Sequence, residues 1–242
     1  MKPLQDQIAV VTGAGSGIGK AIALALGELG ATLVLVGRRL ALLENVAVEL
    51  AARGARANSY PTDLADRESI QNFTQTLLRD FSRLDILVHS AGVVRLGNVA
   101  EAPADDFDDQ FRTNVLGPYL LTQALLPVLR QRRGQVVFIN SSVSLAPRAG
   151  VSQYAATKSA LKAVADSLRA EVNPDGIRVL SIYPGRTATP TQENLHAQEQ
   201  KPYRAERLLQ PEDVAQIVTN ALCLPFTAEV TDLHIRPMMK SD

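Results

Sequence analysis

The sequence predicts an α/β fold of the Rossmann-like, doubly wound type, in which helices cover both faces of a mostly parallel sheet of about seven strands. Two observations predict it. Short aliphatic runs alternate with helical segments along the 242 residues, and most of these runs are apolar at consecutive positions, as in strands buried on both faces. The first run is also followed by a glycine-rich turn that leads directly into a helical segment, which is the arrangement of a nucleotide site.

Each predicted element follows from this alternation. The predicted strands are Ile8–Val11, Thr32–Val36, the more polar Arg56–Tyr60, Ile86–Val88, Val136–Ile139, Val179–Ile182 and Leu233–Ile235. Helices are predicted over residues 18–29, 40–53, 66–82, 104–132, 153–172 and 211–223. The length suits one domain over residues 1–242. Residues 190–209 are polar and show no clear apolar period, so we interpret them as an irregular lid over a substrate site.

Composition excludes several classes of function. The 25 Lys and Arg residues balance the 25 Asp and Glu residues, which argues against binding nucleic acid or an anionic membrane surface. No apolar signal core or membrane span is recognisable, and we expect a cytoplasmic protein. Cys223 is the only cysteine, and its apolar surroundings predict a small core residue. We expect no metal site, and we interpret His89, at a strand end, as structural.

The glycine-rich turn predicts a binding site for a pyrophosphate. Free N–H groups and the helix dipole would attract the anion, and glycines let the backbone come close to it. The predicted contacts are Gly13, Gly15, Ser16, Gly17, Ile18 and Gly19. With Thr12 before it, the order Gly-x-x-x-Gly-x-Gly resembles that of the short-chain dehydrogenase/reductase family.

The end of the second strand indicates which dinucleotide binds. An Asp or Glu about twenty residues after the glycine turn would bind the adenosine ribose of NAD, but Gly37 stands there. Arg38 and Arg39 follow, and a guanidinium suits a 2′-phosphate. We therefore predict that NADP(H) is preferred over NAD(H). The alternative is that both arginines are only solvated charges at a strand end.

Tyr154 and Lys158 are four residues apart on a predicted helix and so share one face. A neighbouring ammonium favours the phenolate, which makes the tyrosine a workable general acid or base. Ser141 follows Gly134 by seven residues and precedes Tyr154 by thirteen, and both intervals match the catalytic serine of the family that the chain resembles. Ser142 remains the alternative.

The resemblance implies further site residues. Asn114 corresponds to the family's fourth catalytic residue, and Pro118, four residues on, cannot donate a hydrogen bond to the Asn114 carbonyl. In the family that carbonyl holds a water that contacts the catalytic lysine. Ser90 stands where the family usually has an asparagine that steadies the central sheet, so a shorter side chain would have to make its hydrogen bonds. By the same resemblance, the further cofactor contacts are Asp63, Leu64, Ser90, Ala91, Gly92, Pro184, Gly185, Thr187 and Thr189, besides Tyr154 and Lys158.

Together these motifs predict an NADP(H)-dependent oxidoreductase that interconverts a carbonyl and a secondary alcohol on a small molecule. The alternative is a non-catalytic dinucleotide-binding regulator on the same fold. Apolar residues on more than one face of the segment 104–132 predict a homodimer or homotetramer; they are Leu116, Leu120, Leu121, Leu125, Leu126, Val128 and Leu129.

Overall fold

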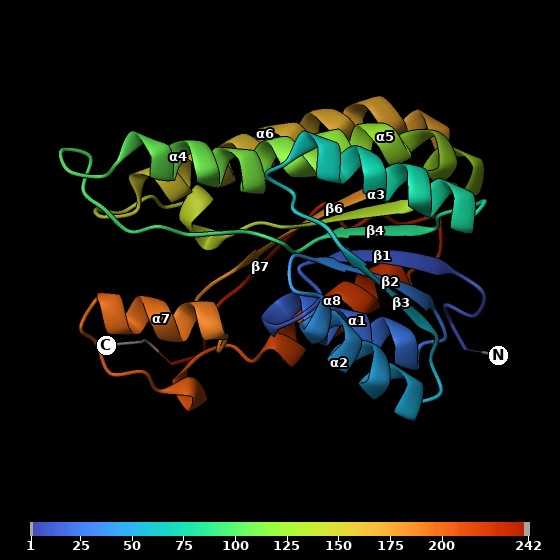
Figure 1. Cartoon of the computed structure of the whole chain (residues 1–242), viewed down its shortest axis with the longest axis horizontal. Helices are drawn as coiled ribbons and strands as arrows, with labels where there is room; N and C mark the ends of the chain where they lie inside the picture. Colours follow the sequence, from blue (N-terminus) through green and yellow to red (C-terminus); the bar gives the residue numbers. More distant parts are fainter. Residues whose placement is uncertain (1, 240–242) are drawn as a thin grey trace.

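The computed structural model describes residues 2–239, and its central sheet lies between two layers of helices, as predicted (Figure 1). Neighbouring strands are all parallel, in the order β3-β2-β1-β4-β5-β6-β7. The strands are β1 (Ile8–Thr12), β2 (Thr32–Gly37), β3 (Ala57–Pro61), β4 (Ile86–His89), β5 (Gln135–Ile139), β6 (Arg178–Pro184) and β7 (Asp232–Ile235). The α-helices are α1 (Gly17–Glu28), α2 (Leu40–Ala52), α3 (Arg67–Asp80), α4 (Ala104–Phe111), α5 (Gly117–Arg132), α6 (Ser152–Val172), α7 (Pro190–Gln198) and α8 (Pro211–Leu222).

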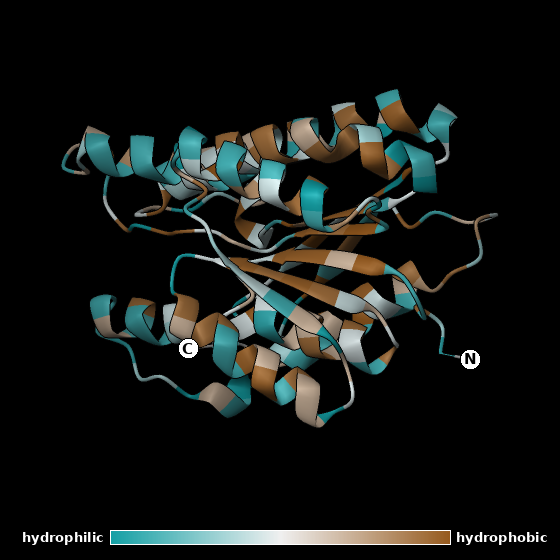
Figure 2. Ribbon diagram, turned by 45° about the vertical axis from the view of Figure 1, so that its right-hand side comes forward, coloured by the Kyte–Doolittle hydropathy of each residue, from teal (hydrophilic) through white to brown (hydrophobic). Residues whose placement is uncertain are grey.

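Successive strand residues face opposite sides of the sheet, and each side has its own core. Val11 belongs to the core formed with α1, α2 and α8, which includes Ile22 of α1. Its neighbour Val10 belongs to the core formed with α3, α5 and α6, which includes Leu125 of α5. In Figure 2 the apolar strands lie between helices whose outer faces are largely hydrophilic. Because helices pack on both faces of the sheet, most strands are apolar at consecutive positions.

The strand order reverses between β1 and β4, which places a crevice at the carboxyl ends of these strands. The Thr12 hydroxyl joins the two ends: it donates to the Val88 carbonyl at 3.3 Å and accepts from the N–H groups of Ser90 and Ala91 at 3.0 and 3.1 Å. The expectation that the side chain of Ser90 makes these bonds is therefore wrong. Thr12 has the right length and position to do so from the neighbouring strand.

The predicted helix over 104–132 is interrupted. A π-helical turn, η1 (Arg112–Leu116), separates α4 from α5, and the Gly117 N–H donates to the Arg112 carbonyl five residues back. Pro118 explains the wider turn, because it lacks an N–H and its ring crowds the carbonyl of Asn114. Every other predicted strand and helix is present, with ends that differ by at most two residues.

Two further expectations from the sequence are wrong. The segment 190–209 is not wholly irregular, since α7 occupies its first half; Thr189 caps this helix by accepting from the Gln192 N–H at 3.2 Å, and Pro190 is its first residue. Cys223 is exposed, because it caps the C-terminus of α8 where the helix leaves the core. Among the described residues, no helix is long and apolar enough to cross a membrane.

Candidate active site

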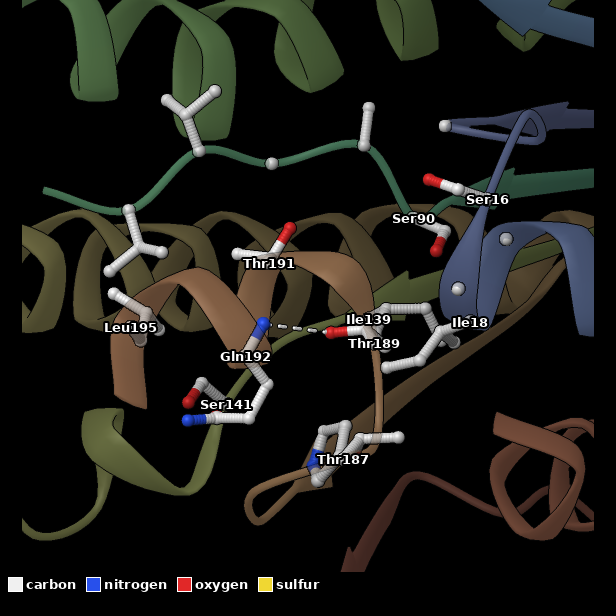
Figure 3. A pocket seen from close by; sticks show the side chains of 18 of the residues that line it. Ser16, Ile18, Ser90, Ile139, Ser141, Thr187, Thr189, Thr191, Gln192 and Leu195 are labelled. Atoms are coloured by element: carbon white, nitrogen blue, oxygen red, sulfur yellow. Dashed lines mark hydrogen bonds between the residues drawn. The ribbon is translucent and has the colours of Figure 1, made fainter. Parts of the chain in front are cut away.

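A pocket of about 1000 Å³ opens at the carboxyl ends of the strands. In Figure 3 its lining extends from Ser16 and Ile18 of the glycine turn to Leu195 of α7. The predicted site residues that line it are Gly13, Gly15, Ser16, Gly17, Ile18, Gly19, Arg38, Arg39, Asp63, Leu64, Ser90, Ala91, Gly92, Ser141, Tyr154, Lys158, Pro184, Gly185, Thr187 and Thr189, together with the alternative Ser142. Asn114 is fully buried behind this lining.

The glycine turn forms a cradle that side chains would fill. Gly17 has a φ of 54°, and a Cβ there would lie 2.9 Å from Cγ2 of Thr189. A Cβ on Gly19 would lie 2.3 Å from the carbonyl oxygen of Gly13, so α1 packs directly on the turn. The first turn of α1 holds no acidic residue, and the side chain of its N-cap, Ser16, makes no capping hydrogen bond. The cradle therefore fits a pyrophosphate at a helix N-terminus.

At the end of β2, the pocket wall is basic. Arg38 and Arg39 are both exposed and line the pocket, and neither forms an ion pair with another described residue. Gly37, the last residue of β2, carries no side chain, and its carbonyl accepts from the Thr62 N–H at 3.0 Å. The helix α2 begins directly after Arg39 and has no acidic residue in its first turn, so this turn holds no carboxylate that would repel a phosphate.

Ser141, Tyr154 and Lys158 come from two elements that meet at the pocket. Ser141 follows β5 and caps the 3₁₀ turn η2 (Ser142–Ser144), where its hydroxyl accepts from the Val143 N–H at 3.3 Å. Tyr154 and Lys158 lie in the first two turns of α6. Lys158 is buried; its Nζ donates to the Ile139 carbonyl at 3.0 Å and lies 5.9 Å from the centre of the Tyr154 ring.

Burial dominates the titration of both groups. It raises the pKa of the Tyr154 phenol, and a hydrogen bond with Ser141 opposes this rise. It lowers the pKa of the Lys158 ammonium to about 8. Both shifts favour the uncharged form, because the surroundings solvate charge poorly. Ser141 thus opposes the rise in the pKa of Tyr154, and Lys158 beside the tyrosine holds its proton weakly.

Asn114 lies in the π-helical turn η1 and binds the segment that follows β4. Its Oδ1 accepts from the Val93 N–H and its Nδ2 donates to the Val93 carbonyl, both at 2.8 Å. Nδ2 also donates to Oγ1 of Thr157 on α6 at 3.1 Å. A Cβ on Gly92 would lie 3.2 Å from Oδ1 of Asn114 and 3.7 Å from Nζ of Lys158. Asn114 therefore fixes the strand end, the pocket wall and α6 relative to one another.

The end of the pocket towards α7 carries an arginine pair. Arg148, from the loop before α6, and Arg186, after β6, both line it. NH2 of Arg186 donates to both carboxylate oxygens of Glu199, at 3.0 and 2.6 Å, and NH2 of Arg148 donates to one of them at 3.3 Å. Although burial alone would raise the pKa of the Glu199 carboxyl, the hydrogen bond from Arg186 and the charges of Arg186, Arg148 and Lys201 lower it. Glu199 is thus ionised at neutral pH.

The predicted lid contributes to the pocket only through α7. Pro190, Thr191, Gln192 and Leu195 line the pocket, whereas the described residues 196–209 do not (Figure 3). His89, interpreted as structural, lies outside the lining: it is buried, its Nε2 lies 2.8 Å from Oγ1 of Thr122, and its ring stacks on Phe138.

Comparison with known proteins gives a consistent result. The family model described as short chain dehydrogenase matches residues 7–200. The chain belongs to the short-chain dehydrogenase/reductase family. An uncharacterized oxidoreductase of Staphylococcus aureus strain N315 is 34% identical over 239 residues, which are 98% of this chain and 100% of that protein.

Solved structures of similar proteins contain NADP or a derivative of it. An alcohol dehydrogenase from the archaeon Thermococcus sibiricus, in complex with 5-hydroxy-NADP, is 29% identical with a TM-score of 0.88, over 98% of each chain. An L-sorbose reductase from Gluconobacter frateurii, in complex with NADPH and L-sorbose, is 27% identical with a TM-score of 0.89, over 97% of each chain. As a member of the family, this chain is an oxidoreductase.

Sequence reasoning missed two parts of the pocket in this short-chain dehydrogenase/reductase. Arg148 and Arg186 are separated by 38 positions and carry no motif, so only the fold brings them to one carboxylate. The segment 236–239 also lines the pocket, and Pro237 packs against Gly185, where a Cβ would lie 3.0 Å from its Cδ. The segment 236–239 could have been found from the sequence, because the predicted strand β7 before it is parallel to β6 and ends at the same edge of the sheet.

Proposed function

We propose that the protein is an NADP(H)-dependent oxidoreductase that interconverts a carbonyl and a secondary alcohol on a small molecule. One observation carries the proposal: a single pocket holds the glycine cradle at one end and Ser141, Tyr154 and Lys158 further along it. The relatives that were crystallised with NADP or NADPH support the choice of cofactor. The same proposal includes a cytoplasmic location and a homodimer or homotetramer.

The pocket fits the cofactor in shape and charge. The cradle at Gly17 and Gly19 would hold the pyrophosphate, and Arg38 and Arg39 would hold the 2′-phosphate. Asp63 would contact the adenine; its Oδ1 accepts from the Ala65 N–H at 2.9 Å, so the carboxylate is held in place. When bound, NADPH would supply the hydride for the carbonyl carbon.

Side chains of the protein would transfer the proton to the substrate. In the direction of reduction, Tyr154 would donate its phenolic proton to the substrate oxygen, while the Ser141 hydroxyl donates a hydrogen bond to the same oxygen. Lys158 would stabilise the resulting phenolate by its charge and bind the ribose of the cofactor. The Asn114 carbonyl, which receives no N–H from Pro118, would hold a water that leads from Lys158 towards solvent.

The test is a screen of the purified protein with NADPH against aldehydes, ketones and keto acids, followed by the absorbance of NADPH. We expect turnover of at least one carbonyl class, loss of turnover in Tyr154→Phe, and nearly unchanged NADPH affinity in that variant. Tyr119→Phe is the matched control, because Tyr119 is exposed on α5 and does not line the pocket. Turnover by Tyr154→Phe at close to the wild-type rate would show that the acid/base assignment is wrong.

A further inference from the structure

The charges that line the pocket are strongly unbalanced. Asp63, at the adenine end, is the one carboxylate in the lining formed by the described residues. The lining also contains Lys158 and five arginines, namely Arg38, Arg39, Arg148, Arg186 and Arg236. Arg38 and Arg39 are accounted for by a cofactor phosphate, but Arg148 and Arg186 lie on the loops that flank the catalytic residues.

Glu199 shows what these two arginines bind. Its carboxylate, which does not line the pocket, accepts from NH2 of Arg186 at 2.6 and 3.0 Å and from NH2 of Arg148 at 3.3 Å. The pair is therefore spaced so that one planar, negatively charged group can contact both guanidinium groups. Arginine is well suited to this task, since its fork of donors matches carboxylate and phosphate oxygens.

Glu199 and the cations that surround it carry a net positive charge. Glu199 faces three cations, because Nζ of Lys201 also lies 3.6 Å from it. One negative charge against three positive charges leaves an excess of two. A cleft with low-dielectric walls concentrates such a field and attracts anions.

Arg148 is the member of the pair with donors to spare. Its side chain is 53% exposed, and the bond to Glu199 is its only hydrogen bond among the described residues. Arg186 is 15% exposed and uses NH1 on His196 and NH2 on Glu199. Arg186 thus holds Glu199 in place, whereas Arg148 lines the pocket and retains N–H groups that no described residue binds.

We infer that the substrate carries an anionic group, a carboxylate or a phosphate, that binds Arg148 while its carbonyl lies at Ser141 and Tyr154. This inference rests on the proposed function and names its substrate class. Val94, Leu96, Val143 and Leu195 also line the pocket, so the part of the substrate between the two polar ends is aliphatic. Arg148 is a specificity-determining residue in this assignment.

The experiment compares matched substrates with NADPH. Keto acids with increasing numbers of carbons between ketone and carboxylate are each paired with the methyl ester, and a phosphorylated ketone is paired with its free alcohol. We expect kcat/KM to be at least tenfold higher for the charged member of the best pair. Whether that best pair contains a carboxylate or a phosphate identifies the anionic group.

Two variants separate recognition from structural damage. Arg148→Gln removes the exposed guanidinium, and we expect it to lower kcat/KM for the charged substrate at least tenfold while the neutral partner changes less than twofold. Glu199→Gln removes the competing internal charge, and we expect it to lower KM for the charged substrate. Arg130→Gln is the control, since Arg130 is 50% exposed, pairs with Asp175 and does not line the pocket.

Calorimetry with NADP⁺ present and the same acids as ligands gives a second readout that does not need turnover. Equal kcat/KM for acids and esters, or an equal loss on both in Arg148→Gln, would overturn the inference and leave the proposed function standing. If no carbonyl is reduced but the acid binds the wild type at least tenfold more tightly than Arg148→Gln, the proposed function is wrong and the anion site is retained. Absence of both turnover and acid binding would reject both.

Discussion

Asn114 and Val93 pair through two hydrogen bonds of 2.8 Å each, one in each direction, as two residues in adjacent strands would. Asn114 is in a π-helical turn, however, and Val93 lies after the end of β4. The side-chain amide of Asn114 therefore makes the two hydrogen bonds that the backbone of a neighbouring strand would make. The pair holds the segment beside the pocket and ties it to α6 through Thr157. We therefore expect Asn114 to matter for stability, besides its role in the proposed proton path.

Asn114→Asp should destabilise the protein by about 3 kcal/mol. The substitution replaces the Nδ2 donor with an oxygen that faces the Val93 carbonyl, and it leaves buried acceptors unpaired. Urea unfolding measures the change. Asn220→Asp, at an exposed position of α8, is the control and should change the free energy of unfolding by less than about 0.5 kcal/mol. Equal values for the two variants would contradict the role given to the pair.

Lys158→Met should abolish turnover and yet stabilise the cofactor-free protein at pH 7. Burial lowers the pKa of Lys158 from 10.5 to about 8, so the unfolded chain binds more protons than the folded protein between these two pH values. The stability of the wild type therefore rises with pH across this window, and the penalty is fully present below it. A shift of this size corresponds to about 3 kcal/mol at pH 7.

Thermal unfolding of the wild type and Lys158→Met at pH 7 and pH 10 tests this difference. We expect the variant to melt about 3 °C or more above the wild type at pH 7, and the gap to narrow as the pH approaches 10. Lys162→Met is the control, because Lys162 lies one turn further along α6 with a half-exposed side chain. A difference in melting temperature that does not depend on pH would show that burial of the Lys158 ammonium does not destabilise the folded protein.

Ser141→Ala should reduce kcat much more than Ser142→Ala. Ser141 opposes the rise in the pKa of the Tyr154 phenol, whereas Ser142 is exposed at the start of η2. Loss of one donor to a developing oxyanion costs about 100-fold or more in kcat. Steady-state kinetics on a proven substrate gives the ranking, and the reverse ranking would move the site by one residue.

NADPH should bind at least tenfold more tightly than NADH, and Arg38→Ala should remove most of that difference, which is about 1.4 kcal/mol. The reason is the exposed guanidinium of Arg38, which lines the pocket and forms no ion pair with another described residue. Calorimetry with both cofactors measures the two dissociation constants. Equal constants in the wild type would show that Arg38 is only a solvated charge.

Light scattering should give the mass of a dimer or a tetramer rather than that of one 26.1 kDa chain. Leu121, Leu125 and Leu129 of α5 are buried against the sheet, but Phe111 of α4 and Tyr119 of α5 are exposed on the same layer. Phe111→Glu should lower the observed mass, whereas Leu78→Glu, on the exposed face of α3, should not. A single-chain mass with full activity at micromolar concentration would rule out this interface.

The sequence predicted the five inner strands well because burial on both faces leaves a clear apolar run in each of them, whereas the edge strands β3 and β7 are less buried and gave weaker patterns. It also predicted the cradle and the Tyr154–Lys158 pair, since glycine turns and helical spacing are local properties. The helix α7 was missed because its sequence is polar, although Thr189 and Pro190 are a recognisable cap and first residue.

Contacts between distant segments could not be predicted in the same way. No local pattern indicates that Arg148, Arg186 and Glu199 share one set of hydrogen bonds, because two of them lie on separate loops and the third caps the C-terminus of α7. Cys223 was misplaced for a related reason: its neighbour Leu222 is buried, and one further step along the helix end reaches the surface.

Thr189 links the two halves of the pocket. Its hydroxyl caps α7, and its methyl group lies where a side chain on Gly17 would be. An anion in the cradle would thus be bound beside the first residue of α7, the helix that lines the other end of the pocket. We therefore expect a compulsory order of binding, with the nucleotide entering first and leaving last, and product-inhibition patterns would show that order.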